Sequence, residues 1–298
     1  MKRVMYMTGV SLGTVLIIVL LLNVRGTPRE NTAGDGLRVV SLAPSVTEML
    51  FTLEVEDCIV GVTDRCDYPP EARNIDRVGG FGKPNMEKLL ALSPDLVIAT
   101  GLQRSDAAAA LQRSGIRMLW VKTDNFLEIF EALREIGREV GKPRQAEQVV
   151  ADMQAELEAV AEQHRTIPPS RRPRVFVELW HDPMTTVGRR SHIDDIIARA
   201  GGVNVAHELD SAYPTINPEK VLEWNPDVIL LGHTDRRKSR MPLAERIGWN
   251  DIAAVRSGKI IEDIPSGVLL RPGPRLIEGV KMLAQRLYGT ETKETVPK

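Results

Sequence analysis

Short apolar runs alternate along this chain with stretches in which apolar residues recur every three or four positions. Apolar runs bounded by turn formers are typical of buried strands, and the longer period is typical of helices with one face on a core. Strands are expected at 38–43, 58–63, 95–99, 117–121, 174–179, 228–232 and 259–264, and helices at 46–53, 107–114, 126–141, 193–200, 242–253 and 275–287. This alternation predicts an α/β fold with mainly parallel sheets covered by helices.

One stretch of the sequence occurs twice. Residues 85–98 and 217–230 share Asn, Glu, Lys, Leu, Pro and Asp at the same offsets, 217 − 85 = 132 residues apart. That spacing exceeds any solenoid period and is the size of a small domain. In each copy Asn can cap a helix and Glu87 or Glu219 follows in its first turn, where the helix dipole stabilises an acid by less than about 1 kcal/mol. Two related lobes are therefore expected.

A helical stretch separates the two copies. Residues 143–165 are rich in Ala, Glu, Gln and Val and predict a single helix of about 20 residues, near 30 Å long. We therefore expect two α/β lobes joined by one long helix, with a ligand cleft between them. The expected parts are a membrane anchor or signal segment (1–24), a tether (25–36), an N-terminal lobe (37–142), the connecting helix (143–167), a C-terminal lobe (168–289) and a disordered tail (290–298).

The composition is that of an ordinary globular protein. Of 298 residues, 43% are hydrophobic and 27% charged, which is enough to bury a substantial core. The formal net charge of −1 leaves no basic excess to neutralise a phosphate backbone, so nucleic acid is not expected as a partner.

The N-terminus differs from the rest of the chain. Lys2 and Arg3 precede residues 4–24, which carry no charge and are long enough to cross a bilayer of about 30 Å. No small-x-small cleavage site follows Leu22, and no Cys is present there to take a lipid. An uncleaved anchor is preferred over a cleaved signal. Either one places the globular part in the periplasm or on the extracytoplasmic face of the membrane.

Sequence motifs give little support for catalysis. Gly9-Val-Ser11-Leu-Gly13 matches a nucleophile-elbow pattern but lies inside the apolar segment, and the loop at 79–83 lacks the spacing that wraps phosphates. All five histidines lie from residue 164 onward, without a metal-binding spacing. No enzyme activity, cofactor or resident metal is expected. The two cysteines, Cys58 and Cys66, are expected to be free thiols, with a disulfide as the alternative.

Loops that follow the expected strands hold aromatic and basic residues, although only 4% of the chain is aromatic. Ligands of α/β lobes usually bind at such strand ends. Aromatic residues on facing loops suggest a cleft for a large, flat, partly apolar ligand. The candidates are Arg65, Tyr68 and Phe81 in the first lobe and Trp180, His181, Tyr213 and Arg271 in the second.

Residues 38–289 resemble the cobalamin, haem and siderophore class of substrate-binding proteins of ABC importers, and the periplasmic cobalamin-binding proteins in particular. The resemblance rests on Val39-Val-Ser-Leu-Ala-Pro-Ser-Val-Thr-Glu48, Asp67-Tyr-Pro-Pro70, the motif at 85–98, Ala200-Gly-Gly-x-Asn204 and Arg271-Pro-Gly-Pro-Arg275. It implies a non-enzymatic monomer that binds a metal chelate between its lobes. It also implies that Glu87 and Glu219 dock to arginines on the membrane permease.

Within this class, the cobalamin-binding branch implies that Phe81 and Tyr213 lie against the corrin ring and that Arg271 contacts its polar groups. Arg65 stands where that branch has an aromatic residue. Arg65 together with Arg271 would also suit the propionates of haem or a ferric siderophore, so these remain alternative ligands. A cleft enzyme or redox protein that uses Cys66 is a competing hypothesis, and so is a tethered sensor that works without a transporter.

Overall fold

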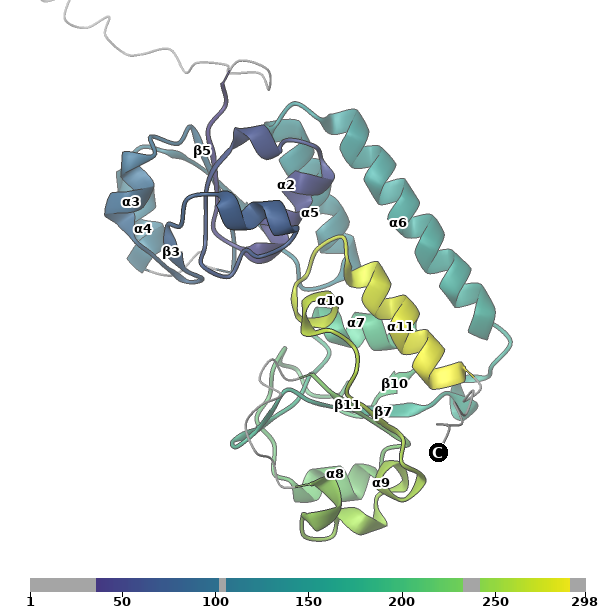
Figure 1. Cartoon of the computed structure of the whole chain (residues 1–298). Coiled ribbons are helices and arrows are strands. Elements are labelled where there is room, and N and C mark those ends of the chain that lie inside the picture. Colours follow the sequence, from purple (N-terminus) through teal and green to yellow (C-terminus); the bar gives the residue numbers. More distant parts are fainter. Residues whose placement is uncertain (1–35, 102–105, 233–241, 290–298) are drawn as a thin grey trace, which may run out of the picture.

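The computed structural model describes residues 36–101, 106–232 and 242–289, and shows two α/β lobes joined along one side by a long helix (Figure 1). Each lobe contains a four-stranded parallel sheet. The strand orders are β2-β1-β5-β6 in the first lobe and β10-β7-β11-β12 in the second. In both sheets the first strand of the lobe is central, which confirms the predicted relationship between the lobes.

The first lobe alternates strands with helices, as the apolar pattern predicts. Asn125 caps the helix that leads out of the lobe, because its side chain accepts a hydrogen bond from the Glu128 N–H. The elements are β1 Val39–Ser41, α2 Pro44–Thr52, η1 Glu56–Cys58, β2 Ile59–Val62, η2 Pro70–Asn74, β3 Gly79–Gly80, β4 Lys83–Pro84, α3 Met86–Ala91, β5 Leu96–Thr100, α4 Asp106–Arg113, β6 Arg117–Val121 and α5 Phe126–Glu139.

The second lobe repeats this alternation with shorter elements. Ser191 caps its first long helix through a hydrogen bond from the Ile193 N–H. The elements are η3 Pro169–Arg171, β7 Arg174–Glu178, β8 Trp180–His181, β9 Met184–Thr185, α7 His192–Arg199, β10 Val203–Asn204, α8 Glu219–Trp224, β11 Val228–Leu231, η4 Leu243–Glu245, η5 Trp249–Asp251, α9 Ala253–Ser257, β12 Ile260–Ile261, α10 Ser266–Leu270 and α11 Leu276–Tyr288.

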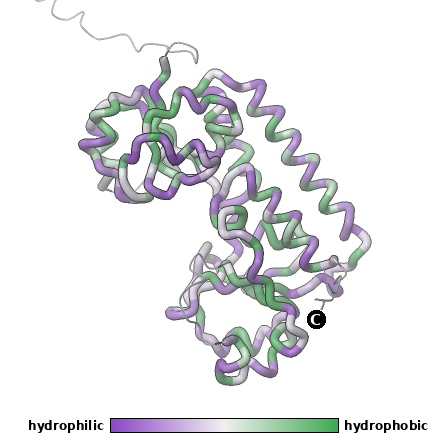
Figure 2. The backbone as a smooth tube through the Cα atoms, viewed as in Figure 1, coloured by the Kyte–Doolittle hydropathy of each residue, from purple (hydrophilic) through white to green (hydrophobic). Residues whose placement is uncertain are grey.

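The predicted connecting helix is α6, Pro143–His164. Its buried residues recur at helical spacing (Ala146, Val150, Met153, Leu157, Val160 and His164), and Figure 2 shows hydrophobic and hydrophilic residues alternating along it. This face packs on α5 and α11, and one hydrophobic core runs from α2 and α5 to α7 and α11. Because the lobes share a core on this side, the helix packs against both of them. Large lobe movements would therefore expose apolar surface.

The repeated stretch has the same local geometry in both lobes. Ser93 and Asn225, each directly before the Pro-Asp pair, have φ values of 45° and 43° and turn the chain out of α3 and α8. The carboxylates that follow, Asp95 and Asp227, each accept the N–H of the residue that precedes or begins the central strand, at 2.9 Å in both cases. The sequence repeat is therefore a structural repeat.

Two sequence predictions in the second lobe are wrong. Residues 242–253 do not form one helix, because Gly248 has φ 76° and divides the segment into η4 and η5, with α9 beginning only at Ala253. The strand expected at 259–264 is only Ile260–Ile261, and α10 was not predicted. Here Trp249 is fully buried, so tertiary packing decides the backbone path.

The expected anchor or signal segment, the tail at 290–298 and nearly all of the tether (25–35) lie outside the described residues. Among the helices within the described ranges, none is both long enough and apolar enough to cross a membrane.

Candidate functional site

A cleft of about 580 Å³ lies between the two lobes. Its walls come from the start of α2, from the loops after β2, β5 and β6, from the turn between β3 and β4, and from α7, α10 and the loop before α8. Such loops at the carboxyl ends of parallel strands are where α/β folds bind ligands. The lining residues are Ala43, Pro44, Ser45, Arg65, Phe81, Thr100, Gly101, Thr123, Asp124, His192, Tyr213, Ser266, Leu270, Arg271 and Pro272.

Two exposed aromatic side chains face this cleft from different lobes. Phe81 lies in the turn between β3 and β4 and is 51% exposed, while Tyr213 precedes α8 and is 48% exposed. Large aromatic rings left in water forgo the burial that normally stabilises them, so exposed rings at a cleft are suited to contact with a ligand. Desolvation and the nearby charge of Asp124 raise the pKa of Tyr213, so its phenol stays protonated at neutral pH.

Polar groups also line the cleft. The hydroxyls of Thr100 and Thr123 lie 3.2 Å apart and link the ends of β5 and β6. Just beyond them, the Phe126 N–H donates to the Asp195 carboxylate on α7 at 2.9 Å, which ties the start of α5 to the second lobe. This hydrogen bond therefore links the two lobes close to the cleft.

His192 also lines the cleft and is nearly fully buried. Its Nε2 is 2.9 Å from the Leu269 carbonyl oxygen, so in the neutral ring Nε2 carries the proton and donates it. Desolvation lowers the pKa of His192 to about 4, against smaller opposing effects of the Leu269 bond and of Asp195. The cleft thus contains a neutral imidazole at physiological pH.

This burial predicts a loss of stability in acid. The folded pKa of about 4 lies below the unfolded value of 6.5, so between these pH values the unfolded chain binds the extra proton. Stability from His192 is present above pH 6.5 and is lost as the pH falls toward 4, by about 3 kcal/mol in all. Urea unfolding of wild type and His192→Gln from pH 4 to 7 should show a steeper decline for wild type. Equal slopes would contradict this assignment.

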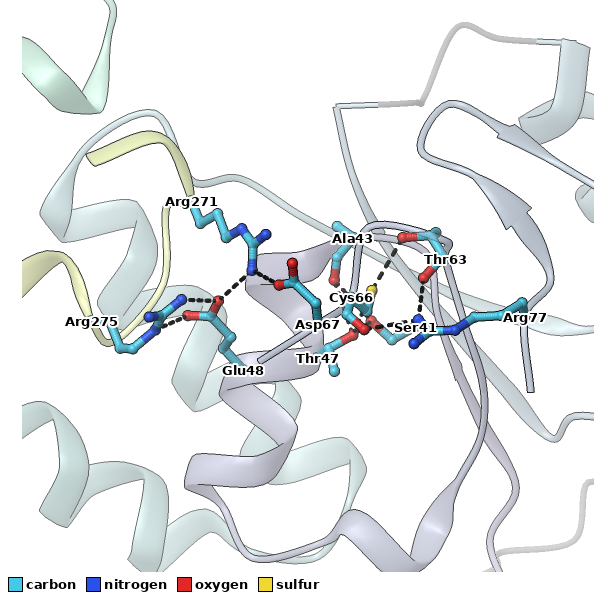
Figure 3. Close-up of polar contacts among 10 residues, drawn as sticks. All are labelled: Ser41, Ala43, Thr47, Glu48, Thr63, Cys66, Asp67, Arg77, Arg271 and Arg275. Carbon is cyan, nitrogen blue, oxygen red and sulfur yellow. Dashed lines mark hydrogen bonds and ion pairs between the residues drawn. The ribbon is translucent and has the colours of Figure 1, made fainter. Parts of the chain in front are cut away.

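Two arginines line the cleft, and their surroundings differ. Arg65 is exposed and makes no hydrogen bond or ion pair with another described residue. Arg271, just after α10, donates through Nη1 to the Asp67 carboxylate at 2.6 Å and lies 3.5 Å from Glu48 (Figure 3). Arg271 therefore reaches across from the second lobe to two acids of the first.

Glu48 is the centre of this contact between lobes. Its side chain on α2 is 2% exposed and accepts two hydrogen bonds from Arg275, at 2.7 and 2.9 Å (Figure 3). Paired bonds of this kind fix orientation as well as charge. The Arg275 guanidinium also lies 3.5 Å from the centre of the Tyr68 ring. Tyr68 therefore supports the contact between lobes and does not line the cleft.

The other two predicted residues outside the lining are Trp180 and His181. They form β8 in a short hairpin with β9 and are exposed, and their rings are tilted by 38° with centres 5.7 Å apart. The Trp180 Nε1–H donates to the Asp182 carbonyl within the hairpin. Of the seven sequence candidates, the structure brings Arg65, Phe81, Tyr213 and Arg271 together in the cleft.

Cys66 does not fit the hypothesis of a cleft nucleophile. Its side chain is fully buried within the first lobe, and its Sγ lies 3.1 Å from the hydroxyls of Thr47 and Thr63. Cys58 is partly buried, and neither cysteine forms a disulfide in the structure. Cys66 is not among the residues that line the cleft.

Several cleft residues were missed in the sequence. Thr123, Asp124 and His192 are common polar residues near predicted element boundaries, with no aromatic or motif signal to distinguish them, whereas Ser45 lies within the Val39–Glu48 motif. Glu48, which belongs to the contact between lobes and not to the lining, could have been found because it ends the same motif.

Glu87 and Glu219 lie in the first turns of α3 and α8, and both are exposed. Neither carboxylate makes a hydrogen bond or ion pair with another residue in the described part of the chain. Figure 1 shows α3 and α8 on different lobes, each far from α6. Both acids are free to meet a partner.

The fold and the cleft agree with a known protein family. A family model for periplasmic binding proteins matches residues 39–266, more than half of the chain. The chain is a periplasmic binding protein. Periplasmic binding proteins of ABC importers capture a substrate outside the cytoplasm and work with permease subunits, and the two-lobed form with a joining helix is the one found here.

Individual relatives agree with this family. The periplasmic binding protein is 33% identical to an uncharacterised ABC transporter substrate-binding lipoprotein of Bacillus subtilis, YvrC, over 86% of this chain and 82% of the relative. It is 28% identical to the vitamin B12-binding protein of Salmonella typhi, over 84% and 90%. The apo periplasmic heme-binding protein RhuT from Roseiflexus is 26% identical, with a TM-score of 0.73 over 85% and 98%. These relatives are binding proteins.

Proposed function

We propose that this periplasmic binding protein captures a corrinoid, cobalamin in the first place, and delivers it to an ABC import permease. The observation that carries the proposal is the pair of exposed aromatic rings, Phe81 and Tyr213, facing one cleft from two lobes. A flat macrocycle between them would cover both rings at once. Its polar rim would meet Ser45, Asp124 and Arg271.

The sequence relatives support this ligand. The Salmonella typhi relative is named as a vitamin B12-binding protein, while the Roseiflexus structure is named as a heme-binding protein. Haem is therefore the second candidate ligand, and the observation that favours it is Arg65, which lines the cleft and has no ion-pair partner among the described residues. For delivery, Glu87 and Glu219 would dock to arginines of the permease. The apolar segment at 4–24 would hold the protein at the membrane.

Titration of the purified protein with cyanocobalamin, haem and a ferric catecholate siderophore tests the ligand. We expect saturable cyanocobalamin binding below micromolar concentration, followed by quenching of tryptophan fluorescence or by calorimetry. The absence of corrinoid binding at micromolar concentration would refute the proposal, and tight binding of haem alone would establish the second candidate.

Removing both aromatic rings should weaken corrinoid binding strongly. Each ring lost from a stacked contact costs about 1 kcal/mol, so Phe81→Ala with Tyr213→Ala should weaken affinity by roughly 30-fold. The fully exposed Ile247, which is not part of the cleft lining, provides the control: Ile247→Ala should change the affinity less than about twofold. An unchanged affinity in the double variant would place the ligand elsewhere.

A further inference from the structure

The ion pair between Asp67 and Arg271 joins a residue of the cleft to one outside it. Arg271 lines the cleft, whereas Asp67 lies in the loop after β2 and is not among the lining residues. The Nη1–Oδ1 distance is 2.6 Å (Figure 3). Both side chains keep some contact with solvent. Arg271, a cation that lines the cleft, is therefore already paired with an acid of the same chain, Asp67.

Asp67 is the main counter-ion of Arg271. Glu48 also lies near Arg271, but at 3.5 Å, and its two oxygens are held by Arg275 at 2.7 and 2.9 Å. The hydrogen bond from Arg271 outweighs desolvation and holds the pKa of Asp67 below its usual range, so Asp67 is ionised at neutral pH. The group of two acids (Glu48 and Asp67) and two arginines (Arg271 and Arg275) therefore carries no net charge.

This pairing leaves hydrogen-bond donors but removes charge. Only Nη1 of Arg271 is bonded to described residues, so Nε and Nη2 remain able to donate to a ligand oxygen. In the cleft lining, the Asp124 side chain makes no hydrogen bond with another described residue, and its carboxylate would repel an anion. Among the described lining residues, Arg65 is the one cation without such a partner, and the charge of the Asp124 carboxylate is opposite to it, so the lining together with Asp67 carries no net charge.

We propose that Asp67 is a specificity-determining residue that neutralises Arg271, so that the cleft selects a macrocycle with neutral amide or hydroxyl groups over one with several carboxylates. This inference rests on the proposed function, because it defines the charge class of the ligand in the same cleft. An amide accepts from Arg271 through its carbonyl oxygen and can donate to Asp124. A carboxylate also accepts from Arg271, but it cannot donate to Asp124, and its charge is repelled by Asp67 and Asp124.

Two shape-matched ligand pairs test the proposal with the purified full chain. One pair is cyanocobalamin and its derivative with propionamides hydrolysed to carboxylates, and the other is haem and haem with both propionates amidated. Wild type should bind the neutral member of each pair more tightly. Asp67→Asn should shift the ratio of affinities toward the anionic member by about tenfold, because Arg271 then lacks its main counter-ion.

Two further variants distinguish the effect of the Asp67–Arg271 ion pair from the general effect of removing a negative charge. Asp64→Asn removes the same charge from an exposed residue of the same loop whose side chain makes no hydrogen bond or ion pair with described residues, and should change the ratio less than about twofold. Asp67→Asn with Arg271→Gln should cancel the shift, since the freed cation is gone.

The outcomes also separate this inference from the proposed function. The role of Asp67 would be overturned if the wild type bound the anionic member of a pair more tightly. It would also be overturned if the ratio of the two affinities in Asp67→Asn equalled the ratio in the wild type or in Asp64→Asn. Failure to bind either corrinoid would refute the corrinoid proposal alone, because the haem pair still reports the charge preference of the cleft.

Discussion

Replacing Glu87 and Glu219 together by alanine is expected to abolish uptake through the permease while leaving ligand affinity unchanged. Both carboxylates are exposed, have no partner among the described residues and lie outside the cleft lining. Their removal therefore leaves the lobes and the ligand contacts intact. Two acid–arginine contacts at an interface can each contribute about 2 kcal/mol or more to docking, so losing both should weaken docking by roughly 1000-fold and transport with it.

Uptake of labelled cyanocobalamin by permease-containing vesicles, measured beside a binding titration, provides the two readouts. Glu71→Ala with Glu262→Ala is the matched control, because it removes one exposed glutamate from each lobe outside the repeated stretch. This control should transport at the wild-type rate. Reduced ligand affinity in the Glu87 and Glu219 variant, or normal transport by it, would show that these acids are not the docking points.

Loss of the Glu48 carboxylate is expected to destabilise the protein by about 3 to 5 kcal/mol. The side chain is 2% exposed and neutralises Arg275, which is itself largely buried. Removing one partner leaves the other charge buried without compensation, which costs more than the pair itself contributes. The free energy of unfolding of Glu48→Gln in urea measures the effect.

The exposed Glu56 on η1 supplies the control for this measurement, since Glu56→Gln should lie within about 0.5 kcal/mol of wild type. Replacing Glu48 and Arg275 together by Gln and Met should recover part of the loss, because no buried charge is then left alone. A Glu48→Gln protein as stable as the Glu56 variant would mean that solvent compensates Arg275.

The predicted elements were most reliable where local pattern and long-range packing agree. The strands 95–99 and 117–121 and the helix from Pro143 appear within one or two residues of their predicted limits, because each buries a continuous apolar run or one helix face. Prediction failed over 242–253, where Gly248 and the buried Trp249 impose turns that the apolar spacing does not reveal.

For the candidate site residues too, the sequence predicted some features, and others depended on the tertiary structure. Aromatic and basic residues in loops were sufficient to indicate Phe81, Tyr213, Arg65 and Arg271, since such residues are uncommon there unless they bind or pack. The sequence could not distinguish binding from packing, however. Tyr68 lies under Arg275, and only the three-dimensional arrangement shows that this ring supports the contact between lobes.

Sequence alone determined that this protein has two related α/β lobes and one long helix between them, because strand and helix periods and the repeat at 85–98 and 217–230 are local properties of the chain. Tertiary structure decided which side chains share the cleft and which charges are already neutralised. Asp67 and Arg271 lie 204 residues apart and meet at 2.6 Å. Folding sets such distances through the packing of whole lobes, which no local pattern records.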